Sequence, residues 1–248
     1  MPMPSLFGLS RTGRSHLSVA VAISTALVAF GTGFFPTASA QAACSSSAGP
    51  GVDWTGCRKR ALIVSGGDFS NAILNRTDFT GSDLRNTNLT GTSMVKATLT
   101  RSSIGGAKLL NASLSGVEGI RLAADKAQLQ SVDMTKSMFF RARFVQAVLN
   151  DVDFSKAEFS RSDFTGAVLQ NTTMESSNLS RVIFLATQFN NVNLKDAWTY
   201  LTDFSGVDLT ATIGLTQNQV DLACGDANTK LPVGLETPST WPCSGADN

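Results

Sequence analysis

Basic side chains recur in this sequence at a spacing that could do chemistry if the chain returns to the same place every twenty residues. Five arginines follow one another at that interval, and four further cations lie on a second series with the same interval. The arginines are Arg101, Arg121, Arg141, Arg161 and Arg181, and the second series is Arg76, Lys96, Lys136 and Lys156. Because a guanidinium is a planar fork suited to phosphate and carboxylate groups, the spacing predicts an Arg/Lys strip that binds an anionic polymer or surface.

Catalytic residues are scarce in the chain. The single histidine is His16, in an N-terminal leader, so the rest of the chain has no histidine base, Ser-His triad or histidine metal ligand. The pairs Gly66-Gly67 and Gly105-Gly106 are not followed by the Lys-Ser/Thr of a phosphate-binding loop. We therefore expect no enzyme activity, no cofactor and no metal site.

Spaced carboxylates give an alternative reading. Asp133 and Asp153 are twenty residues apart, and Asp163 and Asp203 are forty apart. If the fold brings such pairs together, they could hold a cation or act as acid and base, as in an exported ligand-binding protein or enzyme. We favour solvated side-wall carboxylates over this alternative.

The N-terminus has the pattern of a secretory signal peptide over residues 1–40. Arg11 and Arg14 precede the apolar run 17–30, and Ala38-Ser39-Ala40 predicts cleavage before Gln41. An uncleaved anchor and a lipoprotein site at Cys44 are the alternatives. Without residues 1–40 the chain carries 18 basic and 19 acidic residues, so no global field favours nucleic acid. We expect a periplasmic or secreted protein with no transmembrane segment after cleavage.

A large apolar residue recurs every five positions over most of the chain, a period that fits neither an amphipathic helix nor a half-buried strand. The run Phe69, Leu74, Phe79, Leu84 and Leu89 shows it, with Ala72, Thr77 and Ser82 two positions before. This pattern resembles the pentapeptide-repeat family, A-(D/N)-(L/F)-x-x, over residues 62–214. The resemblance implies an all-β, right-handed quadrilateral β-helix with four pentapeptides per coil. The twenty-residue alignment of 131–150 with 151–170 then predicts about seven coils.

The coil at 111–130 is the weakest part of the repeat. Gly119 and Ala124 stand where large core residues belong, but the phase continues unchanged after them. We expect an in-frame coil, with Phe139 and Phe144 leaning into the space. A ten-residue loop is the alternative.

Both ends of the repeat change character, as an exposed stack of coils requires. Residues 41–61 are expected to form an N-terminal cap. Residues 215–248 are expected to form a short helix, opened by a Thr216–Gln219 capping box, and a tail. The motifs Cys224-Gly225-Asp226, Thr229-Lys230-Leu231-Pro232 and Trp241-Pro242-Cys243 resemble the tail of exported proteobacterial members of the family.

The implied fold also pairs the cysteines. Cys44 and Cys57 precede the solenoid, and Cys224 and Cys243 follow it. Because a disulfide needs Cα atoms within about 7 Å, a solenoid of this length favours Cys44–Cys57 and Cys224–Cys243. An oxidising location suits both bonds.

On this fold the arginines form one column and the second series a neighbouring one. The leading function is an exported structural or interaction scaffold whose partner is an unknown protein, an anionic polymer or a surface. A gyrase-protecting DNA mimic, known within the family, is disfavoured because it implies an acidic surface and a cytoplasmic location. Ile120, Phe140 and Tyr200 fall at outward positions, which suggests a homodimer face.

Overall fold

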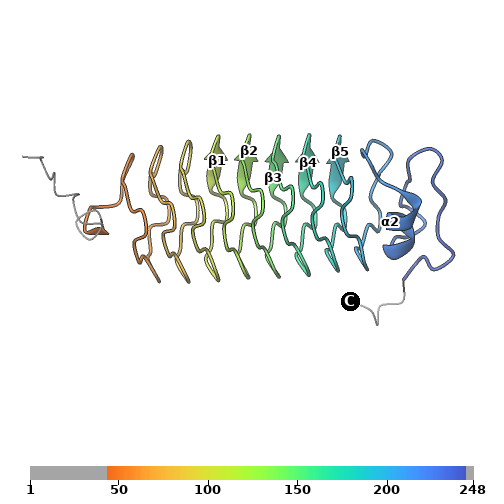
Figure 1. Cartoon of the computed structure of the whole chain (residues 1–248), viewed down its shortest axis with the longest axis horizontal. Coiled ribbons are helices and arrows are strands. Elements are labelled where there is room, and N and C mark those ends of the chain that lie inside the picture. Colours follow the sequence, from red (N-terminus) through yellow and green to blue (C-terminus); the bar gives the residue numbers. More distant parts are fainter. Residues whose placement is uncertain (1–43, 244–248) are drawn as a thin grey trace, which may run out of the picture. The chain divides into compact units, whose positions relative to one another are not determined.

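The computed structural model describes residues 44–243 of the 248-residue chain. The predicted signal peptide and its cleavage site after Ala40 lie outside the described residues. Residues 53–213 wind into a parallel β-solenoid whose coils stack in a straight row (Figure 1). The predicted fold class is confirmed.

Each coil has four sides, because up to Ile213 the residues that pair between coils are twenty positions apart and recur every five positions. We name the outer faces by these columns: face A runs from Asp53 to Ile213, face B from Arg58 to Trp198, face C from Ile63 to Asp203, and face D from Asp68 to Gln188. Residues of one column are therefore neighbours about 4.8 Å apart along the rod.

The solenoid is longer than the repeat pattern predicted. On face A the pairing joins nine successive turns of the chain, whereas about seven coils were expected. The paired residues are Asp53, Ile73, Ser93, Ser113, Asp133, Asp153, Thr173, Asn193 and Ile213. Pairing starts before residue 62 because Val52, Trp54 and Cys57 are buried at the inward positions of an extra coil. Part of the segment 41–61, expected to be a cap, is thus the first coil.

Face D contains the regular strands. They are β1 (Lys108–Leu110), β2 (Gln128–Gln130), β3 (Val148–Asn150), β4 (Val168–Gln170) and β5 (Gln188–Asn190), joined in that order as one parallel sheet. Their central residues, such as Leu109 and Leu149, point inward and are fully buried. The flanking side chains point outward, as alternation along a strand requires.

Corners form where the backbone adopts a positive φ. A residue with φ between 50° and 73° recurs every five positions from Gly51 to Gly206. In many corners a backbone hydrogen bond closes the turn. The residue two positions before the next core residue donates its N–H to the carbonyl of the previous core residue, as Ala72 does to Phe69 O at 3.0 Å. The small residue therefore faces the core beside the large one.

The weak coil at 111–130 stays in frame, as predicted, and pairs on all four faces with its neighbours. A methyl group placed on Gly119 would lie 2.7 Å from Phe139 Cδ1. Phe139 therefore occupies the space that the missing side chain leaves. Its ring stacks on that of Phe159, with centroids 5.2 Å apart.

Helix α2 (Gln217–Leu222) closes the C-terminal end, as expected from the capping box. Thr216 N–H donates to Gln219 Oε1 at 2.9 Å. The Gln219 amide also donates to Leu194 O at 2.7 Å and to Ala197 O at 2.9 Å, which satisfies two carbonyls of the last coil. Beyond the helix, Cys224 and Lys230 continue the pairing of Asp203 and Asp208.

Both predicted disulfides form. The Cα atoms lie 5.4 Å apart in Cys44–Cys57 and 5.5 Å apart in Cys224–Cys243. One bond therefore fixes the first coil and the other fixes the C-terminal tail. Among the described residues, no helix has the length and apolar character to span a bilayer.

Candidate anion-binding surface

The five arginines form a ladder along the corner between faces B and C. Their corner backbone has φ between 56° and 63°, and each N–H donates to the coil that follows, as when Arg141 donates to Ser160 O at 3.0 Å. The same register holds from Arg101, which bonds Ile120 O, to Arg181, which bonds Tyr200 O. The coil at 111–130 does not interrupt this arginine ladder.

The second series lies along the other edge of face B. Arg76, Lys96, Lys136 and Lys156 occupy the corner between faces A and B with φ between 55° and 61°. Gly116 fills the gap in this lysine edge. Nine cations therefore border one face of the solenoid, an arrangement more specific than the two adjoining columns expected from the sequence.

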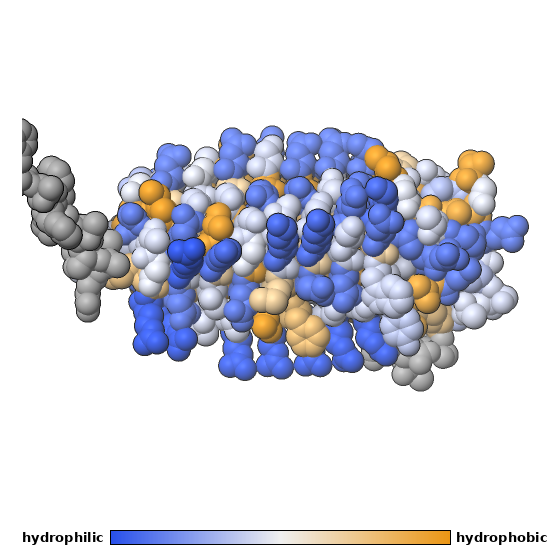
Figure 2. All heavy atoms as spheres, in the orientation of Figure 1, coloured by the Kyte–Doolittle hydropathy of each residue, from blue (hydrophilic) through white to orange (hydrophobic). Residues whose placement is uncertain are grey.

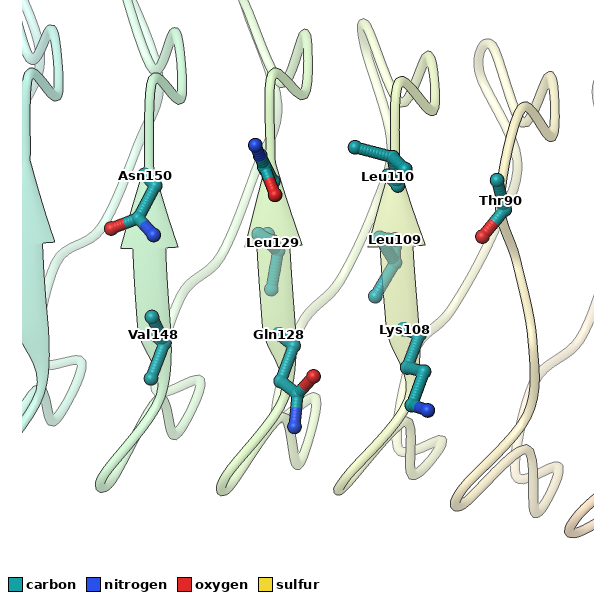
Figure 3. A pocket seen from close by; sticks show the side chains of 9 residues that line it. Thr90, Lys108, Leu109, Leu110, Gln128, Leu129, Val148 and Asn150 are labelled. Carbon is teal, nitrogen blue, oxygen red and sulfur yellow. The ribbon is translucent and has the colours of Figure 1, made fainter.

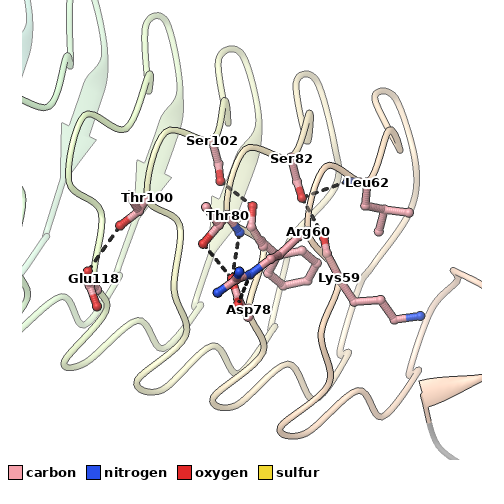
Figure 4. Close-up of polar contacts among 10 residues, drawn as sticks. Lys59, Arg60, Leu62, Asp78, Thr80, Ser82, Thr100, Ser102 and Glu118 are labelled. Atoms are coloured by element: carbon pink, nitrogen blue, oxygen red, sulfur yellow. Dashed lines mark hydrogen bonds and ion pairs between the residues drawn. The ribbon is translucent and has the colours of Figure 1, made fainter.

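Other cations in the described part of the chain form ion pairs. Arg60 pairs with Asp78 at 2.5 Å on face B, next to a network in which Thr100 donates to Glu118 at 3.4 Å (Figure 4). The other paired cations are Arg85, Arg143, Lys195 and Lys230. Within residues 44–243, Arg101, Arg121, Arg141 and Arg161 have no acidic partner, so their charge is available to a ligand.

Two of the arginines lie near aromatic rings of face B. The Arg141 guanidinium carbon is 5.2 Å from the centroid of Phe140, and that of Arg181 is 6.0 Å from Tyr200. Such cation–π contacts are worth about 0.5–1 kcal/mol at exposed sites. These contacts place both guanidinium groups at the rim of face B.

Shallow hollows lie beside the ladder and on face D. One of about 350 Å³ is lined by Arg141, Arg161, Arg181 and Ile183. Another hollow, of about 330 Å³, lies on face D, where Lys108, Gln128, Leu110 and Asn150 project from neighbouring strands (Figure 3). The face D hollow has a single cation and a carboxamide oxygen, Asn150 Oδ1, without a hydrogen-bond partner, so it offers less to an anion.

The carboxylates expected to form pairs accept hydrogen bonds from the backbone. Asp133 and Asp153 are neighbours on face A, as expected, but each accepts a backbone N–H two residues on, from Thr135 at 2.9 Å and Ser155 at 2.8 Å. Asp163 and Asp203 are separated by Ile183 in the face C column. Over residues 44–243, no three His, Cys, Asp or Glu side chains are placed to hold a metal ion.

Sequence reasoning missed two exposed side chains of face B. Met138 and Trp198 are 45% and 52% exposed in the column that also holds Arg58 and Glu158. The twenty-residue spacing could have found them, because it places positions 138 and 198 in one column three coils apart. The expectations for Phe140 and Tyr200 hold, since both are exposed, whereas Ile120 is half-buried.

Comparison with protein families finds pentapeptide repeats within the solenoid. Pentapeptide repeats match residues 65–101, 127–166, 142–181 and 157–196, in 8 copies. A comparison with curated proteins finds no match.

Solved structures that resemble the chain have low sequence identity, and two structures of QnrB1 share its fold. A trypsin-treated variant of QnrB1, a plasmid-mediated fluoroquinolone resistance protein, is 17% identical with a TM-score of 0.50, covering 75% of this chain and 92% of its own. Full-length QnrB1 is 16% identical with the same TM-score, covering 76% and 94%. HetL, involved in heterocyst differentiation in the cyanobacterium Nostoc sp. strain PCC 7120, is 17% identical with a TM-score of 0.29, covering 78% and 87%.

Proposed function

We propose that this chain, whose solenoid carries pentapeptide repeats, is a non-enzymatic exported scaffold that binds anionic polymers or surfaces through the arginine ladder and the lysine edge. The observation that carries the proposal is the unbroken register of Arg101 to Arg181 along one corner of the rod. A linear array of guanidinium groups matches a ligand with many anionic groups better than a single small anion.

Electrostatics point the same way. Like charges about 5 Å apart repel by somewhat under 1 kcal/mol in water, and the ladder repeats this repulsion at every coil. A multivalent anion would remove the repulsion and gain several charge-assisted hydrogen bonds.

Export is supported by the sequence and by both ends of the rod. The predicted leader 1–40 has the pattern of a secretory signal peptide. Disulfides such as Cys44–Cys57 and Cys224–Cys243 persist in oxidising compartments. Cell fractionation, with mass spectrometry that identifies Gln41 as the first residue, tests this part of the proposal. Retention in the cytoplasm with an intact leader would refute it.

Binding to inorganic polyphosphate and to polygalacturonate tests the ligand class. The triple variant Arg141→Gln, Arg161→Gln, Arg181→Gln should bind both roughly tenfold to a hundredfold more weakly, since each exposed charge contributes up to about 1 kcal/mol. Binding by the unmodified protein should also weaken as salt rises.

A charge-matched control removes three cations elsewhere, with Lys108→Gln, Lys126→Gln and Lys195→Gln. These side chains lie away from the arginine ladder, so this variant should keep most of the affinity. Equal weakening in the two variants would mean that only net charge matters, and unchanged binding in the arginine variant would refute the proposal.

A further inference from the structure

Face B is apolar as well as cation-bordered. Its exposed large side chains are Met138 at 45%, Phe140 at 38%, Trp198 at 52% and Tyr200 at 44%. The rings of Trp198 and Tyr200 stack nearly parallel, with centroids 6.4 Å apart. Met138 and Phe140 therefore stand between Lys136 and Arg141 at mid-rod, whereas Trp198 and Tyr200 lie one coil beyond Arg181, near the C-terminal end.

This arrangement gathers two kinds of side chain on a long side of the rod. Figure 2 presents such a side, with rows of hydrophilic side chains along the axis and small apolar groups beside them. Binding of an anionic polymer requires the cations but gives no reason for exposed aromatic rings on the same face. A ligand that is both anionic and apolar would contact both kinds of side chain.

We infer that face B docks on the surface of an anionic lipid bilayer, with the aromatic groups entering the headgroup region and the two cation edges lying against the lipid phosphates. Tryptophan and tyrosine favour this depth because each ring is apolar with one polar atom. A straight solenoid side also suits an extended surface, since residues of one column project in one direction. The inference rests on the proposed function and identifies the anionic ligand as the phosphates of a lipid bilayer.

The acids of face B do not cancel its charge. Face B and its two edges hold Asp78, Glu118, Glu158 and Asp196 against the nine cations. Asp78 is paired with Arg60, Glu118 accepts the Thr100 hydroxyl, and Asp196 lies 3.9 Å from Lys195. Glu158 is the exposed exception, and it stands between the two apolar groups.

The tryptophans allow a direct test of insertion. Trp54 is 1% exposed in the core, and the Trp241 indole donates to Ala223 O at 2.7 Å within the C-terminal cap. Trp198 is therefore the indole that should meet lipid. With vesicles of phosphatidylcholine and phosphatidylglycerol, its emission should shift to shorter wavelength and be quenched by brominated acyl chains, and the Trp198→Phe variant should lose this response.

Variants on opposite faces separate the aromatic contribution from general hydrophobicity. Trp198→Ser with Tyr200→Ser should weaken vesicle binding roughly tenfold, the loss expected when large apolar side chains are no longer buried. The control, Leu110→Ser with Val148→Ser, removes exposed apolar residues from face D and should leave binding unchanged. Circular dichroism should show the same fold for both variants, since all four side chains are at the surface.

The outcomes distinguish the inference from the proposed function. Polyphosphate binding without binding to anionic vesicles overturns the inference and leaves the proposed function standing. Loss of both refutes both. Equal binding to pure phosphatidylcholine, equal losses in the two variants, or a solution dimer that shields Trp198 from brominated lipid would also overturn the inference.

Discussion

At the scale of single residues, the solenoid tolerates a gap in its core when the next coil fills it. Other coils place Phe79, Leu99 or Phe159 at the inward position of face B, whereas the coil at 111–130 has Gly119. Phe139 occupies the vacated space, and it is fully buried there. The glycine and the phenylalanine therefore form one packing unit across two coils.

The Gly119→Ala substitution tests this unit. Its Cβ would lie 2.7 Å from Phe139 Cδ1, so overpacking should lower the free energy of unfolding by about 1–3 kcal/mol. The double variant Gly119→Ala, Phe139→Leu should lose roughly 1 kcal/mol less than the sum of the losses in the two single variants. Thermal or chemical denaturation measures the free energy of unfolding of each variant. As a control, Phe164→Leu changes a residue further along the rod and should show no such coupling with Gly119→Ala.

At the scale of the structural elements, the last full coil is joined to its predecessor on three faces only. Faces A, B and C keep their pairs, but no backbone hydrogen bond within the described chain joins residues 186–191 to 205–211. A cleft of about 440 Å³ opens there on face D. The C-terminal tail compensates on the far side, where Lys230 N–H donates to Val207 O and Leu209 N–H donates to Lys230 O.

The ion pair at this tail contact should be visible in a pH titration. Hydrogen bonds from the Thr210 hydroxyl and from Lys230 Nζ, the latter at 2.9 Å, lower the pKa of Asp208 from 3.8 to about 2. Since the folded pKa is depressed, the stabilisation is complete above pH 3.8 and is lost as the pH falls towards 2. Both side chains are more than half exposed, so the effect on unfolding should be small.

Carboxyl NMR gives the measurement. Asp208 should titrate near pH 2 in the unmodified protein, and Lys230→Gln should raise its pKa part of the way to 3.8, because the Thr210 hydroxyl remains. Thr210→Val in addition should raise it further. A midpoint that does not respond to Lys230→Gln would mean that the tail contact is absent in solution.

Regular features of these elements follow from the sequence, and exceptions do not. The five-residue period predicts the inward positions and the corners because these depend on register alone, and the length of the implied solenoid predicts both disulfides. The first coil was missed because Trp54 and Lys59 occupy positions where the repeat has Leu or Phe. The break on face D has no signal in the sequence, since Phe189 and Leu209 keep the repeat pattern, and we find no residue that explains it.

At the scale of the whole molecule, stability is distributed along the rod, because each coil contacts only its two neighbours. The middle is reinforced by stacked phenylalanines, with Phe144, Phe164, Phe184 and Phe204 forming a ladder whose centroids are 4.8–5.5 Å apart. The ends depend on caps. At the N-terminal end, Ile63 is 78% exposed, and Leu62 and Val64 are only partly buried.

Reduction of the disulfides should therefore loosen the ends while the middle stays folded. Each bond closes a loop of 13 or 19 residues, for which chain entropy predicts about 3 kcal/mol of stabilisation. Hydrogen exchange under reducing conditions should accelerate first in residues 44–70 and 203–243, and last around Phe139 to Phe184. The Cys224→Ser, Cys243→Ser variant should reproduce only the C-terminal part, which makes it the matched control for the N-terminal bond. Uniform acceleration along the chain would instead show that the coils unfold as a single cooperative unit, with caps that govern the whole rod.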